Sequence, residues 1–286
     1  MLTNKYNLPQ PFVTAVEAGQ KSYQSSHGQR SDISVTQLIS PAQIVQLQRE
    51  NPRADEDVSD RVWALLGQLM HGILESSDDG NELVEQRLYR DIAGWTISGQ
   101  FDRFEVIPGI LSDWKLCSVW EHIGGLRPER EQQLNCLAWL LSPIHKVSQL
   151  QIVSVYRDWS KNKALAGGDY PQQQVAVHNM RLWSPEEQER YISERVAMHQ
   201  TMREGGPVTI PCTPEDQWAK PTVFAVMKQG RKSAVKLHKD IIKANEHATS
   251  DDKLSVVVRP GERTRCIHYC AVSSYCKQYA EEHADG

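Results

Sequence analysis

The chain has 286 residues, of which 40% are hydrophobic and 24% are charged, and its formal net charge is −4. This composition is typical of a globular protein with one large core or two smaller ones, and it excludes a uniformly basic protein that coats DNA, although a local basic groove is compatible with it. No apolar run is long enough to span a membrane and the N-terminus lacks the apolar segment of a signal peptide, so we expect a cytoplasmic protein.

The first thirty or so residues are polar and aperiodic, so we expect a partly mobile lead-in, with order beginning near Ile33. Ser40 and Pro41 then supply the N-cap and the first residue of a helix that we expect to continue to about Gln48. We assign residues 1–58 to this lead-in and helix, ahead of the main domain.

A second helix is predicted from Ser59 to Leu74, because apolar residues recur there at helical spacing. One face of this helix is therefore expected to pack on the core. Gly67 would let the helix approach a neighbouring backbone closely, and His71 follows one turn later. His71 is either a histidine whose ring is satisfied by a backbone carbonyl or a ligand that overlooks the sheet.

Residues 95–117 predict a β-hairpin, because β-branched and aromatic residues fill both arms and a Pro-Gly pair stands between them. Asp113 and Lys115 share one face of the second strand. If the register pairs Asp102 with either of them, all three side chains project from that face, whereas a one-residue slip separates them. Such a group can hold Mg²⁺ and assist an attacking water. The competing interpretation is a surface hairpin with ordinary salt bridges.

The segments around this hairpin complete a predicted α/β core. Glu85 precedes a strand and is interpreted as a solvated edge residue rather than an additional acid. Further elements are predicted in order: a loop at 120–126, a helix at 127–141 with Gln133 on its flank, strands at 147–156 and 174–180, and a capped helix from Ser184 to about Arg203. This succession fits a mixed central sheet flanked by helices, which we assign to residues 59–204.

After Gly205 the character of the sequence changes, and we assign residues 205–286 to a C-terminal subdomain. A helix is predicted from about Ser233 to His247, between two strands. The densest basic region of the chain lies here: Lys228, Arg231, Lys232, Lys236, Lys239 and Lys243. These cations form either a phosphate-binding surface or a solvated helix face.

Half of the six cysteines stand close together near the C-terminus, at Cys266, Cys270 and Cys276. Three thiolates at these intervals can close around one ion or cluster, and Cys212 is the obvious fourth. Zinc suits four thiolates, or three with His268, and an iron–sulfur cluster suits four. Buried thiols without a metal are the alternative.

Four sequence elements together resemble a known family: His71, the motif Gly99-Gln-Phe-Asp102, the motif Asp113-Trp-Lys115, and Gln133. This pattern is similar to the PD-(D/E)XK nuclease superfamily, specifically to its RecB-like exonuclease branch as found in phages. In that branch, an aromatic residue stands four positions after the glutamine. Here Leu137 occupies that position.

The resemblance implies a restriction-endonuclease-like core with a small C-terminal cysteine-rich subdomain. It assigns Mg²⁺ or Mn²⁺ to four ligands: His71, Asp102, Asp113 and the main-chain carbonyl of Trp114. With Asp102 and Asp113, it makes Lys115 and Gln133 catalytic, Lys115 assisting the attacking water and Gln133 positioning the site. A [4Fe–4S] cluster, with Zn²⁺ as the alternative, would pin the C-terminal segment, although this chain lacks the cysteine that several members carry before the helical histidine.

The function expected from the resemblance is that of a metal-dependent DNA nuclease, an exonuclease acting in recombination, repair or replication of DNA, in the bacterial host cytoplasm if phage-encoded. DNA is the expected partner, contacted by Lys228, Arg231, Lys232 and Lys236, together with a recombinase, a single-strand annealing protein or a helicase. Two alternatives stay open. One is a catalytically silent DNA-binding or assembly factor that retains the fold, and the other is a nuclease directed at RNA.

Overall fold

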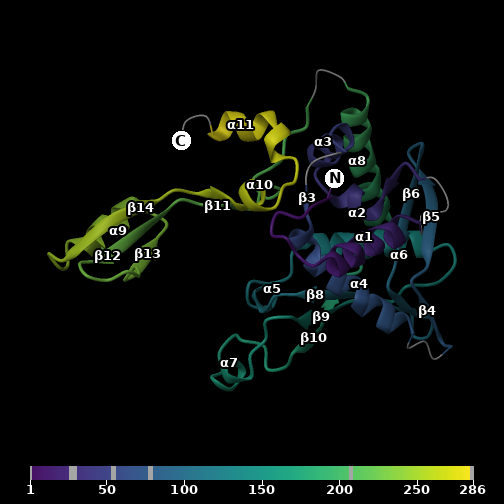
Figure 1. Ribbon diagram of the computed structural model, residues 1–286, viewed down its shortest axis with the longest axis horizontal. Coiled ribbons are helices and arrows are strands. Elements are labelled where there is room, and N and C mark those ends of the chain that lie inside the picture. The colour runs from purple at the N-terminus through teal and green to yellow at the C-terminus, as the bar shows by residue number, and fades with distance from the viewer. Residues whose placement is uncertain (1, 26–30, 53–55, 77–79, 206–208, 284–286) are drawn as a thin grey trace. The chain divides into compact units, whose positions relative to one another are not determined.

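A mixed five-stranded sheet organises the computed structural model (Figure 1). Its strands, in the spatial order β10–β9–β8–β7–β4, are Val175–Met180, Gln149–Tyr156, Ile110–Cys117, Arg103–Glu105 and Glu82–Val84. β8 and β9 run parallel, whereas the other neighbours are antiparallel. β8 and β9 are rich in Val, Ile and Leu, as strands covered by other elements are. The predicted mixed α/β fold is thereby confirmed.

The structure describes residues 2–25, 31–52, 56–76, 80–205 and 209–283. The chain divides into two units: residues 1–45 with 53–209, and residues 46–52 with 210–286. The first unit contains the sheet, and the second contains the basic and cysteine-rich segments. None of the helices in the described ranges is long and apolar enough to cross a membrane.

A second sheet of the first unit consists of β2 (Ile33–Ser34), β6 (Trp95–Gln100) and β5 (Arg87–Ile92). The prediction of a single hairpin over residues 95–117 is therefore wrong in one respect. β6 pairs with β2 and β5, so in the first arm of the predicted hairpin it is the shorter β7 that pairs with β8. The chain changes sheets at Phe101 and Asp102, where the backbone bonds to the segment before β5 instead.

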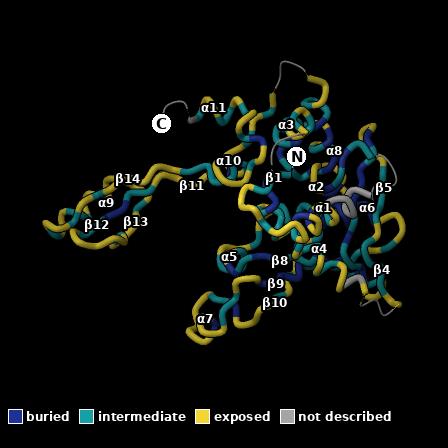
Figure 2. The backbone as a smooth tube through the Cα atoms, in the orientation of Figure 1, coloured by how far each residue is buried: buried dark blue, intermediate teal, exposed yellow. Residues whose placement is uncertain are grey.

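Two long helices cover the core side of these sheets. α6 (Pro128–Leu141) is buried from Leu134 onwards and packs on β6, β8 and β9, which is why the tube in Figure 2 is dark blue along its second half. α8 (Pro185–Arg203) packs on α6 and begins at Ser184, whose hydroxyl accepts from the backbone of Glu187. The predicted capping box at Ser184 is thus confirmed.

The N-terminal segment is more ordered than its composition predicted. α1 (Gln10–Ser25) precedes α2 (Val35–Ile39) and α3 (Ala42–Glu50), and β1 (Leu2–Thr3) pairs with β3 (Glu56–Asp57). The predicted lead-in is wrong for the described residues before Ser25; residues 26–30 lie outside the described part. The reason is that Val13 and Val16 of α1 pack with Val58 in a small core of their own.

α4 (Val62–Glu75) forms after a short 3₁₀ turn, η1 (Val58–Arg61), at the predicted place. Its apolar face does not pack on the core as expected, because Leu69 is 57% exposed and Ile73 is 71% exposed. The expectation for Gly67 is also wrong, since a Cβ added there would meet no atom within 4 Å. α4 nevertheless contacts β8, and α1 packs on α4 near Leu65.

The segment at residues 120–126 was predicted to be a loop, but its first part is a helix, α5 (Val119–Ile123). The side chain of Ser118 accepts a hydrogen bond from the backbone N–H of Trp120, which provides the N-cap that starts this helix. A second short helix, α7 (Lys161–Leu165), lies in the connection from β9 to β10.

The second unit contains a sheet of order β13–β12–β14 (Lys236–His238, Val223–Lys228 and Leu254–Arg259) with α9 (Ile241–Ala248) beside it. We call residues 223–259 the basic lobe. The helix predicted from Ser233 is wrong in its first half, because residues 236–238 pair with β12 and Asp240 caps a shorter helix. The remaining elements are β11 (Ala219–Lys220), β15 (Glu262–Arg263), α10 (Thr264–His268), η2 (Ser273–Tyr275) and α11 (Lys277–His283).

Candidate metal centre

The register between β7 and β8 brings the two predicted carboxylates together. Arg103 pairs with Ser112, so continuing this register by one residue places Asp102 opposite Asp113. The two side chains then lie on the same face of the pair, as the sequence argument requires. The backbone N–H of Trp114 donates to Oδ2 of Asp102 at 2.7 Å, which fixes the first carboxylate against the second strand.

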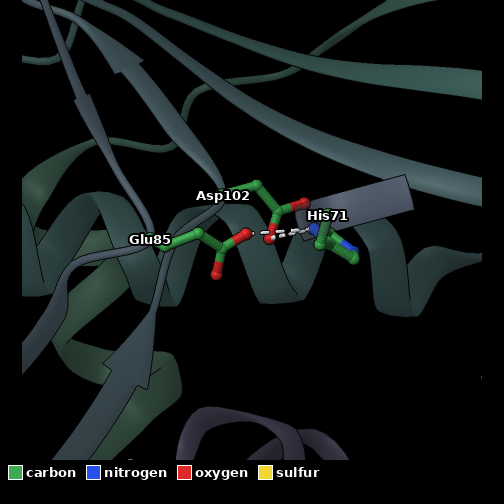
Figure 3. Close-up of side chains that lie close together, drawn as sticks. All are labelled: His71, Glu85 and Asp102. Atoms are coloured by element: carbon green, nitrogen blue, oxygen red, sulfur yellow. Dashed lines mark hydrogen bonds and ion pairs between the residues drawn. The ribbon is translucent and has the colours of Figure 1, made fainter. Parts of the chain in front are cut away.

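α4 adds an imidazole to this pair. Nδ1 of His71 lies 3.1 Å from Oε1 of Glu85 and 3.7 Å from Oδ1 of Asp102, and the three side chains point toward one another (Figure 3). Their ligand atoms all lie within 4.8 Å of one another, and within the described ranges no other trio of His, Cys, Asp or Glu does so. The structure therefore contains a candidate metal centre.

Glu85 was predicted to be a solvated edge residue, but its carboxylate is part of the candidate metal centre. It stands between β4 and β5 with a left-handed φ of 50°, and its backbone N–H donates to the carbonyl of Asp102 at 3.0 Å. The amide of Gln100 donates to Oε2 of Glu85 at 2.6 Å. No local pattern indicated this place, because it depends on an unusual backbone conformation and on a long-range bond.

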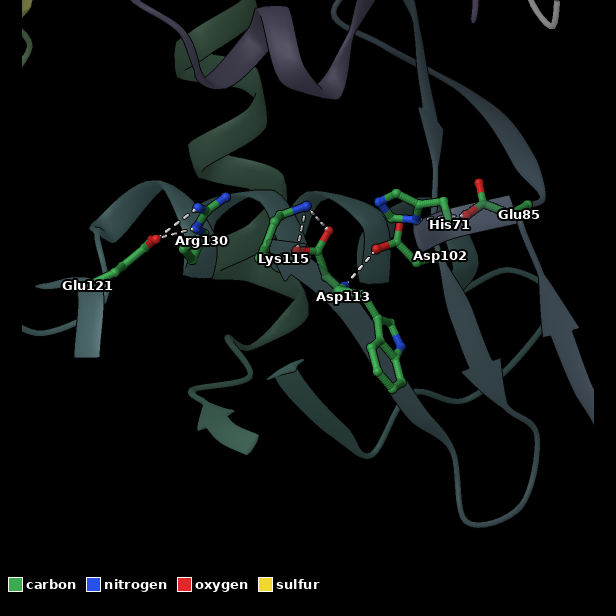
Figure 4. A network of polar contacts seen from close by, with 8 residues as sticks. His71, Glu85, Asp102, Asp113, Lys115, Glu121 and Arg130 are labelled. Atoms are coloured by element: carbon green, nitrogen blue, oxygen red, sulfur yellow. Dashed lines mark hydrogen bonds and ion pairs between the residues drawn. The ribbon is translucent and has the colours of Figure 1, made fainter. Parts of the chain in front are cut away.

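Asp113 and Lys115 form the other half of the site (Figure 4). Asp113 is only 1% exposed, and Nζ of Lys115 lies 2.7 Å from each oxygen of its carboxylate. Lys115 thus neutralises a carboxylate that is almost entirely buried, and its ammonium lies against both carboxylate oxygens.

The carboxylates of Asp102 and Asp113 repel each other electrostatically. Burial, together with the nearby charge of Asp113, raises the pKa of Asp102 to about 7. The hydrogen bond from His71 to Glu85 raises the pKa of the imidazole above its ordinary value against the opposing effect of burial, and the charge of Asp102 acts in the same direction as Glu85. A positive charge between the carboxylates would relieve their repulsion.

The donor set fits a divalent cation. Carboxylate oxygens are the preferred ligands of Mg²⁺, and Mn²⁺ accepts carboxylates and imidazole together. Glu85, Asp102 and His71 offer such donors at short mutual distances, whereas the carboxylate of Asp113 is paired with Lys115. The main-chain carbonyl of Trp114 was predicted to be a further ligand. The backbone N–H of the same residue donates a hydrogen bond to Asp102.

Gln133 lies in the first half of α6 and is half-buried. Leu137, one turn later, packs so closely on Gly99 of β6 that a Cβ at Gly99 would stand 2.7 Å from its Cδ2 atom. Gln133 shares this side of the helix. Its side chain makes no hydrogen bond to the described residues of the centre. Leu137, at 2% exposure, belongs to the core, where it takes the place of the family's aromatic residue.

The predicted cysteine ligands all belong to the second unit. Burial raises the pKa of Cys212 to about 12, and the charges of Asp216, Cys276 and Cys266 contribute to the rise. Cys270 is likewise influenced by Cys276, so the four sulfur atoms lie near one another. No three of them lie within 4.8 Å of one another, as far as the structure describes the chain.

The predicted nucleic-acid contacts divide into two kinds. Nζ of Lys228 lies 2.8 Å from Oδ2 of Asp251, so the charge of this lysine is compensated. Arg231, Lys232 and Lys236 are exposed, and none of them forms an ion pair with a described residue.

These features define a mixed α/β protein with a candidate metal centre of carboxylate and imidazole ligands. No family model matches the chain. No curated protein matches it either. Among solved structures, it is similar to a chain described as "Crystal structure of SSO0001", with 18% sequence identity and a TM-score of 0.49, over 69% of this chain and 91% of that chain.

Proposed function

We propose that this protein is a metal-dependent DNA nuclease with a restriction-endonuclease-like core, and that it acts as an exonuclease. One observation carries the proposal. Asp102, the residue before β7, lies opposite Asp113 of β8 when the register of the two strands is continued by one residue, with His71 beside the first carboxylate and Lys115 against the second. Burying charged groups costs free energy, so a buried cluster of charges is more often found at a functional site than elsewhere. Phosphodiester hydrolysis is a reaction that uses this combination of groups.

His71, Glu85 and Asp102 would hold Mg²⁺ or Mn²⁺, with Asp113 and the carbonyl of Trp114 as further ligands. A divalent cation bound there polarises a phosphate and lowers the pKa of a neighbouring water. The Glu85 carboxylate, fixed by Gln100, keeps the imidazole of His71 in place.

Lys115 and Gln133 act on the substrate side of the site. The ammonium of Lys115 is held by Asp113 and offers its charge to the negative charge that builds on the phosphate during attack. It also orients the attacking water. Gln133 presents an amide that is not engaged by the described residues of the centre, and this amide positions the DNA backbone.

The basic lobe supports DNA as the substrate. Residues 223–259 contain eight basic and four acidic residues, so this lobe carries a net charge of +4 in a chain whose net charge is −4. Most of its cations are exposed and lack a carboxylate partner within the described residues, as expected of a surface that attracts a polyanion. The lobe would bind the phosphate backbone of the DNA.

We assign the four cysteines of the second unit to a structural [4Fe–4S] cluster. Four thiolates suit such a cluster, and they also suit a tetrahedral zinc site, which is the alternative. A visible absorption spectrum of anaerobically purified protein tests the assignment, because a broad brown band is expected of the cluster and zinc gives none.

Degradation of linear DNA with Mg²⁺ tests the proposed function. Wild-type protein and the control Asp169→Ala, which changes an exposed aspartate, should degrade DNA, whereas Asp113→Ala should lose at least about a thousandfold in rate. Equal activity of Asp113→Ala would show that the assigned site is wrong. Inactivity of all three proteins, with DNA binding retained, would favour the catalytically silent DNA-binding factor. Preference for RNA in the same assay would favour an RNA-directed nuclease.

A further inference from the structure

Arg130 of α6 is held rigidly next to the metal centre by Glu121 of α5. Its Nε and Nη2 atoms donate to the two oxygens of Glu121 at 2.9 and 3.2 Å, which is a bidentate arrangement. α5 itself is fixed at its start, because Ser118 and the backbone N–H of Val119 donate to Asp158 at 2.6 and 2.8 Å. The guanidinium plane therefore has a defined orientation.

The other edge of this guanidinium is not used by the protein. Arginine has five N–H donors in a planar fork, and Glu121 takes only two of them. Nη1 of Arg130 makes no hydrogen bond to any described residue. In Figure 4, this third nitrogen points away from Glu121 and toward the side of Lys115.

The position of Arg130 on α6 places it along the site. Arg130, Gln133 and Leu137 are spaced by three and four residues, so they lie on one side of the helix. That is the side on which Leu137 contacts β6 next to Gly99. Figure 4 places the guanidinium beside Lys115 and Asp113, and, against the effect of burial, the hydrogen bond to Glu121, together with the smaller effect of the charge of Asp113, raises the pKa of Arg130.

We propose that Arg130 and Lys115 form an anion site that binds the phosphate next to the scissile one in a nucleic-acid strand. Glu121 holds one edge of the guanidinium so that the other edge presents parallel N–H groups, the geometry that matches two phosphate oxygens. The inference rests on the proposed nuclease function and adds a substrate-binding residue to it. Arg130 binds the substrate, and Glu121 is a positioning residue that acts through Arg130.

A purely structural ion pair is the competing explanation, in which Glu121 and Arg130 only join α5 to α6. The two explanations differ in the salt dependence of DNA binding. A cation that contacts a phosphate releases a counterion, and its loss lowers the slope of log Kd against log salt concentration by about one. A structural pair that does not touch DNA leaves the slope unchanged.

The experiment measures binding of a short DNA duplex, with Ca²⁺ in place of Mg²⁺, over a range of salt concentrations. The variants are Arg130→Gln, Arg130→Lys and the control Arg190→Gln, which removes an exposed arginine of α8. Arg130→Gln should weaken binding about tenfold and lower the slope by about one. Arg130→Lys should keep the slope, because the charge is retained. Arg190→Gln should match the wild type.

Thermal unfolding and kinetics complete the test. Arg130→Gln should raise KM with Mg²⁺ while kcat changes less than threefold, since a ground-state phosphate contact is lost. A wild-type slope and KM for a folded Arg130→Gln protein would overturn the inference while leaving the nuclease proposal intact. Failure of wild-type protein to bind or degrade DNA would instead overturn the proposed function. If Arg130→Gln unfolds, Glu121→Gln is measured instead. Releasing the guanidinium from Glu121 should raise KM, so a wild-type KM in a folded Glu121→Gln protein would contradict the inference.

Discussion

Lysine side chains lie in different surroundings in the candidate metal centre and in the basic lobe. In the centre, Lys115 has one-fifth of its side chain exposed and lies against a buried carboxylate, so its position is fixed. In the lobe, Lys232 and its neighbours are exposed and have no carboxylate partner within the described residues. Chemistry on one bond requires fixed groups, whereas attraction of a phosphate backbone requires only charge at the surface.

The lobe also contains its own exception. Lys228 forms an ion pair with Asp251, as Lys115 does with Asp113. Its exposed neighbours in the lobe form no such pair with a described residue. Sequence alone grouped Lys228 with Arg231, Lys232 and Lys236, because all are cations close together. Variants in the centre are therefore expected to change metal affinity and reaction rate, whereas variants of the exposed cations are expected to change the salt dependence of DNA binding.

Among the variants that test this comparison, the largest effect is expected at Glu85, the proposed ligand that the sequence did not predict. Glu85→Gln should lower both Mn²⁺ affinity and the rate of DNA degradation by about a hundredfold, since a carboxylate of the centre and the partner of His71 is lost. Isothermal titration with Mn²⁺ and a nuclease assay measure the two effects. Glu189→Gln, an exposed change on α8, serves as the control. Unchanged metal affinity would remove Glu85 from the centre.

Close packing beneath the centre gives the next effect. A Cβ at Gly99 would lie 2.7 Å from Leu137 and 2.9 Å from Val35, so Gly99→Ala should cost about 1–3 kcal/mol of unfolding free energy. Gly67→Ala is the matched control in α4, where the new Cβ meets nothing within 4 Å, and it should gain about 0.5–1 kcal/mol. Denaturant unfolding measures both. Equal stability of the two variants would contradict the packing.

Charge removal in the lobe should have a smaller effect on affinity. Arg231→Gln combined with Lys232→Gln should weaken DNA binding several-fold and lower the salt slope by about two, because two phosphate contacts are lost. Lys228→Gln should leave the slope near that of wild type, since Asp251 already compensates this charge. Binding curves at several salt concentrations provide the measurement. A larger loss from Lys228 would reverse the assignment.

The smallest expected effect concerns pH and the metal-free protein. The pKa of Asp102 is about 7 in the folded state, above its ordinary value of 3.8, so the folded protein holds this proton between about pH 4 and pH 7 while the unfolded chain loses it. Stability in EDTA therefore falls as pH rises through this window. Asp102→Asn should raise Tm by a few degrees at pH 8 and by almost nothing at pH 4. The same difference at both pH values would contradict the shift.

Local sequence patterns predicted some features of the fold and the candidate site and missed others. The placement of Asp113 and Lys115 on one face of a strand and the Ser184 cap depend on local geometry, so the sequence alone predicted them. The register that sets Asp102 opposite Asp113 was only one of the pairings that the sequence allowed, and the structure selects it. The order of α1 was missed because its few apolar residues are diluted by polar neighbours. The exposure of Leu69 depends on which elements cover α4, which no local pattern encodes.

By itself, the sequence determined that two carboxylates and a lysine could share one face of neighbouring strands, because alternation along a strand is a property of the backbone. Only the tertiary structure decided that Glu85 joins His71 and Asp102, and that Glu121 holds Arg130 beside them. These contacts join elements that are separate in the chain. Their geometry follows from how helices and strands pack, and that packing is fixed only once the whole core has formed.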